Sequence, residues 1–168
     1  MRVIVRAPYQ ASGSYIEQFI ADRTDWIVEH LRKLEQKNRQ CNDALPVKKL
    51  SNDELKKLAD KACSYIPGRV AHFAPLVGVT YGRITIRNQR TRWGSCSSKG
   101  NLNFNCLLML TPPEVIDYVV VHELCHRKEM NHSGRFWDEV ARVLPGYAEQ
   151  EKWLKTHGSE IMKRMTGE

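Results

Sequence analysis

The sequence predicts a small α+β fold in one domain spanning residues 1–168. A length of 168 residues fits one compact domain, and a hydrophobic content of 42% with 27% charged residues excludes a wholly disordered chain. The apolar periodicity is helical near the N-terminus, alternates over a short central stretch and becomes helical again towards the C-terminus. The expected architecture is therefore helices before and after a small, mainly antiparallel sheet.

The first predicted elements are a short strand and a long amphipathic helix. Val3-Ile4-Val5 predicts the strand, which Pro8 ends. Ser14 and Glu17 have the spacing of a capping box, so the helix should begin there and run to a polar stretch at about 37–42. Its apolar face recurs at helical spacing and consists of Ile16, Phe19, Ile20, Trp26, Ile27, Leu31 and Leu34.

A second helix is predicted from Ser51 to about Leu76. Ser51 and Glu54 form another capping box ahead of a helical apolar pattern. Pro67-Gly68 should break or kink this helix, because proline lacks the amide proton and clashes with the preceding turn. Gly78 should end it.

Two alternating segments predict the sheet. Ile84 and Ile86 alternate with polar neighbours, as do Leu102 and Phe104. Residues 97–100, between them, have the composition of a hairpin turn. We therefore expect the two segments to flank a tight turn in a hairpin.

Three helical stretches are expected after the sheet. Thr111 should cap the first, with Pro112 at its first helical position. The second should begin at Ser133, and the third should cover 147–168 with a break at Gly158.

The composition narrows the partners and the location. A net charge of +7 favours acidic partners such as nucleotides or nucleic acid, although a solvated basic surface is the simpler explanation. The longest apolar run is far too short to span a membrane, and the N-terminus lacks a secretory apolar segment. The five cysteines are an odd number without a CxxC pair, which argues against a disulfide framework. We therefore expect a cytoplasmic protein with reduced thiols.

The strongest chemical signal is the run His-Glu-Leu-Cys-His at 122–126, in the helix after the sheet. Residues four apart lie one turn apart on the same helix face, so His122 and His126 can bind one divalent ion. Glu123 then lies beside the ion, where a carboxylate can accept a proton from water. Two adjacent buried imidazoles with no ion would oppose each other's protonation. The pattern therefore favours a metal-dependent hydrolase.

A catalytic metal site also needs a third protein ligand. His132 comes six residues after His126, where the chain can turn back before the helix at Ser133. The residues that compete for this role are Glu139, Glu149 and His157.

An arginine-tryptophan segment precedes the predicted turn. Arg90 and Arg92 should share one side of a strand, where both can bind a carboxylate or a phosphate in a cleft. Trp93 either lines that cleft or packs in the core. The same two alternatives, a place in the cleft or a structural role, are open for Asn103 and Asn105. An edge strand here could bind extended peptide through main-chain hydrogen bonds.

Together these motifs resemble a known family. The similarity is carried by four runs, namely RTRWGSCS at 90–97, NLNFN at 101–105, PPEVIDYVVVHELCH at 112–126 and NHSGRFW at 131–137. They closely resemble the YgjP-like metallopeptidase family of metal-dependent hydrolases, which is related to the SprT-like and WLM zincins. The resemblance covers most of the chain and implies a small zincin-like fold. It also implies that His122, His126 and His132 hold one zinc ion and that Glu123 is the catalytic base.

Three functions are compatible with these features. The first is a zinc-dependent peptidase that acts on peptide or protein substrates. The second keeps the metal but hydrolyses nucleotides or phosphate esters, and the third is a nucleic-acid-binding module with a structural metal. Glu123 argues against the third, because a structural site has no use for a carboxylate placed to meet water. Candidate oxyanion donors for the first are Tyr118, Tyr147 and Arg92.

Overall fold

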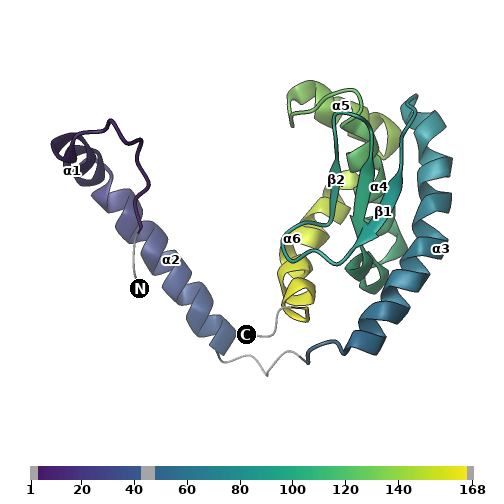
Figure 1. Cartoon of the computed structure of the whole chain (residues 1–168), viewed down its shortest axis with the longest axis horizontal. Helices are drawn as coiled ribbons and strands as arrows, with labels where there is room; N and C mark the ends of the chain where they lie inside the picture. The colour runs from purple at the N-terminus through teal and green to yellow at the C-terminus, as the bar shows by residue number, and fades with distance from the viewer. Residues whose placement is uncertain (1–3, 43–47, 166–168) are drawn as a thin grey trace. The chain divides into compact units, whose positions relative to one another are not determined.

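The computed structural model describes the backbone of residues 4–42 and 48–165, and the side chains of these ranges outside 34–42. The chain divides into two compact units, residues 1–46 and residues 47–168. The described residues form six α-helices, one 3-10 helix and a three-stranded sheet, which confirms the α+β class (Figure 1). The extent of the domain, 1–168, stays a prediction.

The first unit contains α1 (Gly13–Ala21) and α2 (Thr24–Asn42). The Ser12 side chain caps α1 by accepting a hydrogen bond from the Tyr15 amide, so the cap predicted at Ser14 is wrong by two residues. The single long helix predicted here is interrupted at residues 22–23, between α1 and α2.

The predicted N-terminal strand is also wrong where it can be checked. Ile4 and Val5 are not in a strand, and Val3 lies outside the described residues. A strand needs a neighbour for its backbone groups, and the described part of the sheet consists of later segments alone. No side chain of α1 is buried, and Tyr15 and Trp26 are exposed.

The second unit begins with α3 (Asn52–Val77), a long helix whose ends match the prediction. The Glu54 amide donates to Ser51 Oγ over 3.2 Å, and the Ser51 amide donates to Glu54 Oε2 over 2.8 Å. Gly78 ends the helix in the left-handed conformation, with φ at 77°. Pro67-Gly68 does not break the helix, because α3 continues through it with a buried face packed along α4, and the alternative of a kink there stays a prediction.

The sheet consists of β1 (Ile84–Arg87), β2 (Gly94–Cys96) and β3 (Leu102–Asn105), in the order β1-β3-β2. The predicted turn at 97–100 joins β2 to β3 as an antiparallel pair. β1, however, pairs with β3 in parallel. The expectation that β1 and β3 form the hairpin is therefore wrong, and the sheet is mixed rather than mainly antiparallel. The reason is that the short strand β2 follows β1 and takes the place next to the turn.

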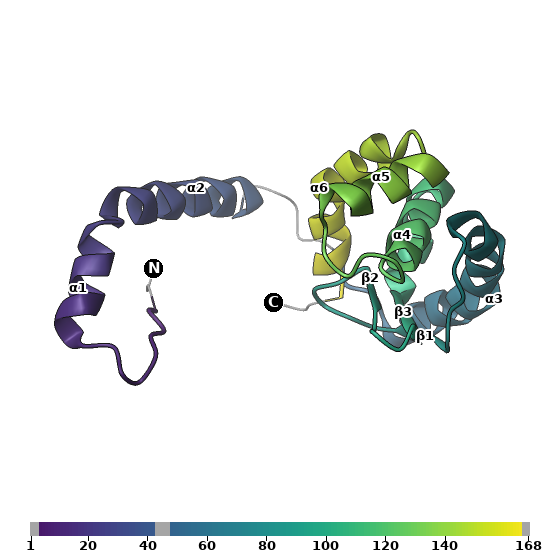
Figure 2. The same cartoon turned by 90° about the horizontal axis from the view of Figure 1, so that it is seen from above.

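A 3-10 helix, η1 (Cys106–Leu110), leads into α4 (Pro113–Cys125), the central helix of this unit. α4 contacts α3, α5 and α6 as well as β2 (Figure 2). It begins one residue later than predicted, because Pro112 is its N-cap while Thr111 Oγ1 donates to the Leu108 carbonyl over 2.8 Å. Because most of its side chains are buried, α4 is held firmly against its neighbours.

The last helices are α5 (Gly134–Val143) and α6 (Tyr147–Lys163). The predicted cap at Ser133 is confirmed, since its Oγ accepts from the Phe136 amide over 3.4 Å. The break predicted at Gly158 is wrong, and α6 runs through this residue. Gly158 is buried against Trp93, where a Cβ would lie 3.2 Å from the indole Nε1. Glycine at this position thus lets α6 approach the loop that carries Trp93 closely.

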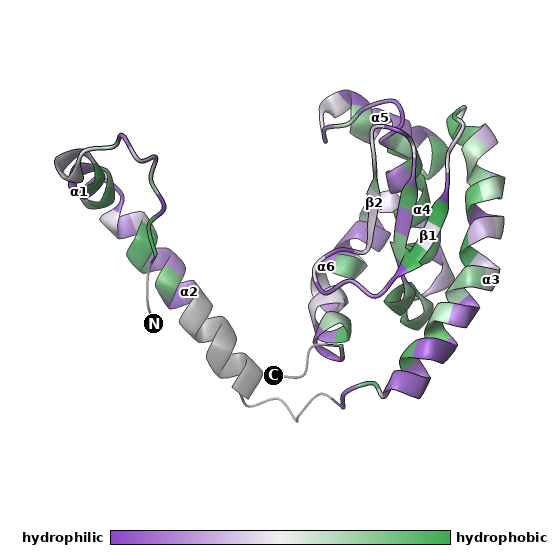
Figure 3. Ribbon diagram, in the orientation of Figure 1, coloured by the Kyte–Doolittle hydropathy of each residue, from purple (hydrophilic) through white to green (hydrophobic). Residues whose placement is uncertain are grey.

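The hydrophobic core of the second unit lies between α3, α4 and one face of the sheet. Hydrophobic residues concentrate on α4 and β1 in Figure 3. Fully buried side chains from all these layers form one cluster, including Ile66, Leu102, Phe104, Val120 and Leu124. Among the described residues, no helix has both the length and the apolar character needed to cross a membrane. The cytoplasmic location stays a prediction, and the four cysteines with described side chains are free thiols.

Candidate metal centre and cleft

Three histidines converge at the C-terminal end of α4. His122 lies in the last turn of the helix, His126 is its C-cap, and His132 comes just before the cap of α5. One ligand nitrogen from each lies within 4.8 Å of the other two, and His122 Nε2 is 3.0 Å from His132 Nε2. Ligand nitrogens around a tetrahedral ion at 2.0–2.1 Å stand roughly 3.3 Å apart. The structure therefore brings the three predicted ligands together at a spacing that fits a metal ion.

The protonation states of His126 and His122 also suit metal binding. His126 Nδ1 lies 3.0 Å from the Glu129 carbonyl oxygen, which can only accept, so the proton is on Nδ1 and the Nε2 lone pair is free. Burial, together with the neighbouring imidazoles of His126 and His132, lowers the pKa of His122 to about 3. His122 is therefore neutral at physiological pH, as a metal ligand must be.

A buried phenylalanine supports all three rings. Phe136 has no exposed surface, and its ring centroid lies 4.6 Å from that of His126 and 4.8–4.9 Å from those of His132 and His122. Trp137 stacks on His132 at 5.8 Å. Because α5 carries both aromatic residues, the packing of α5 against α4 fixes the orientation of the imidazoles.

Glu123 is buried next to the histidines, with 6% of its surface exposed. Burial raises the pKa of its carboxyl group to about 8, and nearby Arg92 opposes this shift. No hydrogen bond from a described residue engages the carboxylate. Glu123 is thus a carboxyl group that can exchange a proton near neutral pH.

The wall opposite Glu123 is the edge strand β2. A Cβ on Gly94 would lie 2.6 Å from Glu123 Oε1 and 2.7 Å from Glu123 Cγ, which is closer than such atoms approach. Only glycine at this position leaves room for the carboxylate between α4 and β2. Gly94 was not singled out by the sequence analysis, because a lone glycine in a strand carries no signal for such a contact.

Two cavities meet at Glu123. One, of about 240 Å³, is lined by the three histidines and Glu123 on one side and by residues of β2, including Ser95 and Cys96, on the other. The second, of about 270 Å³, extends between α4 and α6. Both are lined by Arg92, Gly94, His122 and Glu123. Met130 and Cys96, which line the first cavity, had not been predicted as site residues, whereas Tyr118, a candidate oxyanion donor, lines the second.

The predicted substrate-binding residues lie in different surroundings. Arg90 and Arg92 are in the loop between β1 and β2, so the expectation that they share a strand is wrong. Arg92 lines both cavities, whereas Arg90 is exposed and lines neither. Trp93 lines the second cavity and also packs on the core. A substrate-binding role for these three residues stays a prediction.

The two asparagines of β3 use their amides within the protein. Buried Asn105 donates from Nδ2 to the carbonyls of Gln89 and Arg92, over 2.6 and 2.9 Å, and accepts from the Leu107 amide. Asn103 bonds Ser95 Oγ and Arg87 Nε. Their assignment to substrate binding stays a prediction, and these contacts favour a structural role. Asn105 in particular fixes the loop that carries Arg92.

The residues that competed with His132 as the third metal ligand either pair with other side chains or lie outside the histidine cluster. Glu139 pairs with Lys128 and Arg142, both at 2.9 Å. His157 Nδ1 lies 3.1 Å from the Trp153 carbonyl, and neither His157 nor Glu149 belongs to the histidine cluster.

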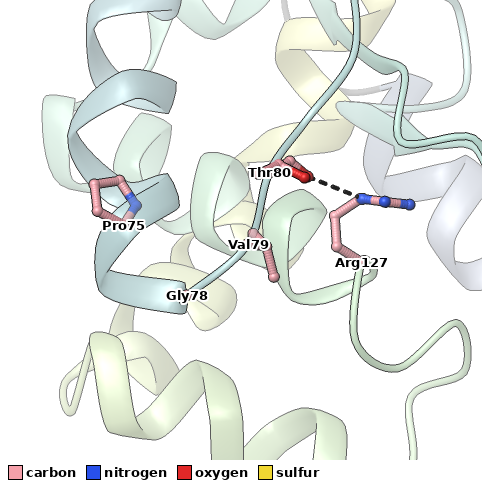
Figure 4. A pocket seen from close by; sticks show the side chains of 5 residues that line it. All are labelled: Pro75, Gly78, Val79, Thr80 and Arg127. Atoms are coloured by element: carbon pink, nitrogen blue, oxygen red, sulfur yellow. Dashed lines mark hydrogen bonds between the residues drawn. The ribbon is translucent and has the colours of Figure 1, made fainter.

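A more open hollow of about 510 Å³ lies at the end of α3 (Figure 4). Arg127 there donates from Nε to the Thr80 carbonyl, as drawn in Figure 4, and from Nη1 to the Ser98 carbonyl, both over 3.1 Å. Its guanidinium thereby joins α4 to the β2–β3 turn. The described lining of this hollow holds no carboxylate or histidine that could serve as a base for the Thr80 hydroxyl, so its described contacts make it a structural junction.

Comparison with known proteins identifies a family for most of the chain. Residues 46–157 match the family model described as "YgjP-like, metallopeptidase domain". No curated protein matches the chain. Among solved structures, the metallopeptidase zymogen of Pyrococcus abyssi abylysin is similar with a TM-score of 0.50 and 27% identity, over 54% of this chain and 92% of that chain. The metallopeptidase zymogen of Methanocaldococcus jannaschii jannalysin has a TM-score of 0.48 and 21% identity, over 54% and 94%.

Proposed function

The chain belongs to the YgjP-like metallopeptidase family, and we propose that it is a zinc-dependent peptidase with Glu123 as its catalytic base. His122, His126 and His132 would hold one ion. The observation that supports this most strongly is the convergence of three imidazole nitrogens beside a buried carboxyl group that faces the same cavity. A closed structural site would need a fourth protein ligand, and none joins the cluster among the described residues.

Three imidazoles suit Zn²⁺ as the ion, and they leave its positive charge uncompensated. When bound, such an ion lowers the pKa of water towards 7 and polarises a carbonyl group. The chain's own contribution is to keep one side of the site open to the cavity while Phe136 holds the ligand rings in place.

Glu123 acts as the proton carrier. It accepts a proton from the attacking water at a carboxylate oxygen and donates it to the leaving nitrogen of the peptide. Its raised pKa suits both steps, because a carboxylate of ordinary pKa is a weaker base towards water, while a pKa near neutrality still lets the protonated group donate to the leaving nitrogen. The positive charge of Arg92 lowers this pKa in part, and the charge of a bound ion would lower it further and so favour the ionised carboxylate at the start of the cycle.

Arg92 is the residue best placed to bind a negatively charged group of the substrate or the developing oxyanion. It lines both cavities, and none of the ion pairs among the described residues engages it. No observation favours a phosphate ester over a peptide as substrate, and nothing in the fold or the comparisons supports a nucleic-acid partner.

The decisive experiment compares the wild type with Glu123→Gln, which keeps the shape of the side chain. Both proteins should contain about one zinc per chain by metal analysis, while His122→Ala with His126→Ala should lose it. Hydrolysis of denatured protein substrates should fall by at least about a thousandfold in Glu123→Gln. Unchanged hydrolysis in this variant would show that Glu123 is not the base.

A further inference from the structure

The second cavity at Glu123 is a preformed hollow whose far walls are apolar. It lies between α4 and α6, two helices that stand side by side in Figure 2. Beyond the four residues that it shares with the histidine cavity, it is lined by Trp93, Tyr118, Val119 and Leu154, with Thr91 at its rim. Since the two cavities share Glu123 and His122, a peptide bound for cleavage in the first would place a neighbouring side chain in the second.

The walls of this cavity are held in place by contacts outside it. Gly158 backs the Trp93 ring at near-contact distance. The Tyr118 ring lies parallel to Tyr147 at 6.3 Å, and Tyr147 stacks on Trp137 at 5.4 Å. A cavity with fixed walls loses little entropy when it is filled, which favours selective binding.

The size and the charges of the cavity define the group that it fits. An apolar cavity of about 150 Å³ already holds benzene, so about 270 Å³ accommodates a branched aliphatic or aromatic side chain. Arg92 at the mouth opposes a cationic side chain, and buried Glu123 opposes an anionic one. Burial raises the pKa of Tyr118, with Glu151 and Tyr147 adding to the effect. The Tyr118 side chain therefore adds no charge to the wall of the cavity.

We propose that this cavity is a specificity pocket for a large apolar side chain next to the cleaved peptide bond. This inference rests on the proposed peptidase function and adds the class of substrate, namely polypeptides cut beside residues such as Leu, Met or Phe. One missing methylene in such a pocket changes selectivity by about 10- to 200-fold. The preference for Phe or Leu over Gly should therefore be at least about tenfold in kcat/KM.

The test is a set of alanine-based peptides in which one position beside the cleaved bond varies, with cleavage sites assigned by mass spectrometry. Leu154→Trp fills the cavity from α6, and Lys152→Trp is the control, because Lys152 is exposed on the same helix. Leu154→Trp should lower kcat/KM for Phe peptides by a factor at least about tenfold larger than for Ala peptides. Leu154→Ala should shift the preference towards larger side chains, and Lys152→Trp should behave as the wild type.

Binding to the Glu123→Gln variant, measured by calorimetry with leucine- and glycine-containing peptides, separates the two proposals. Zinc-dependent turnover with no apolar preference, or with a preference for Asp, Glu, Lys or Arg, would overturn the pocket and leave the peptidase proposal standing. Tighter binding of the leucine peptide without turnover in the wild type would overturn the peptidase proposal. An equal loss for all peptides in Leu154→Trp would count against the pocket.

Discussion

The two walls of the catalytic cavity are built in different ways. On one side, α4 presents His122, Glu123 and His126 from a single stretch of five residues. On the other side, Gly94 and Arg92 are held by residues far away in the sequence, such as Asn105 and Gly158. The reactive groups are thus local, whereas the space around them depends on long-range packing. Substitutions in the two walls should therefore have effects of different size.

Among changes outside the proposed catalytic groups, Gly94→Ala should damage turnover most. The added Cβ would collide with the Glu123 carboxylate, so the carboxyl group must move. A displacement of about 1 Å from the productive position costs on the order of a hundredfold in rate. We expect kcat to fall by that factor while zinc content stays at about one ion. Gly134→Ala is the matched control, since a Cβ there meets nothing within 4 Å. Full activity in Gly94→Ala would mean that the β2 wall does not position Glu123.

Asn105→Ala should lower stability more than Asn103→Ala. The first change leaves two loop carbonyls and the Leu107 amide without their buried partner, and each such loss costs about 1–3 kcal/mol. We expect the free energy of unfolding in urea to fall by at least about 2 kcal/mol. Asn103 is half-buried and water can replace its bonds, so its loss should cost about 1 kcal/mol or less. Equal losses would contradict the role given to Asn105.

The metal-free protein should become less stable as the pH rises from 6.5 to 8. The raised pKa of Glu123 means that the folded state holds a proton which the unfolded state has already released. The lowered pKa of His122 acts in the opposite direction, but only between about 3 and 6.5. Above 6.5 the Glu123 effect remains, with a slope of at most about 1.4 kcal/mol per pH unit. Urea unfolding in EDTA measures it, and a Glu123→Gln protein with the same slope would refute the assignment.

Gly158→Ala should have the smallest effect. Alanine improves helix propensity by up to about 1 kcal/mol, but its Cβ would press on the Trp93 indole. These effects oppose each other, so the free energy of unfolding, measured by thermal denaturation, should change by less than about 1 kcal/mol. kcat/KM for peptides should nevertheless fall about two- to fivefold, because the Trp93 loop shifts. Gly146→Ala, where a Cβ meets nothing within 4 Å, should leave kcat/KM unchanged.

The parts of the fold that were correctly predicted depend on neighbours in the sequence. The caps at Ser51 and Ser133 are confirmed because a capping bond joins residues three apart. The α+β class followed from periodicities that each element shows by itself. One error is local, since the cap of α1 is Ser12 and not Ser14. The errors in the sheet and in α6 concern long-range partners, since neither the parallel pairing of β1 with β3 nor the continuity of α6 through Gly158 is set by adjacent residues.

For the candidate site, the sequence alone determined the chemistry, namely two imidazoles and a carboxyl group at one end of a helix, because helical spacing fixes which side chains share a face. It also placed His132 among several candidates for a third ligand. Only the tertiary structure decided that the His132 ring meets the other two, that Phe136 lies beneath them and that Gly94 leaves room for Glu123. These contacts join separate elements, and the packing of the whole core sets their distances.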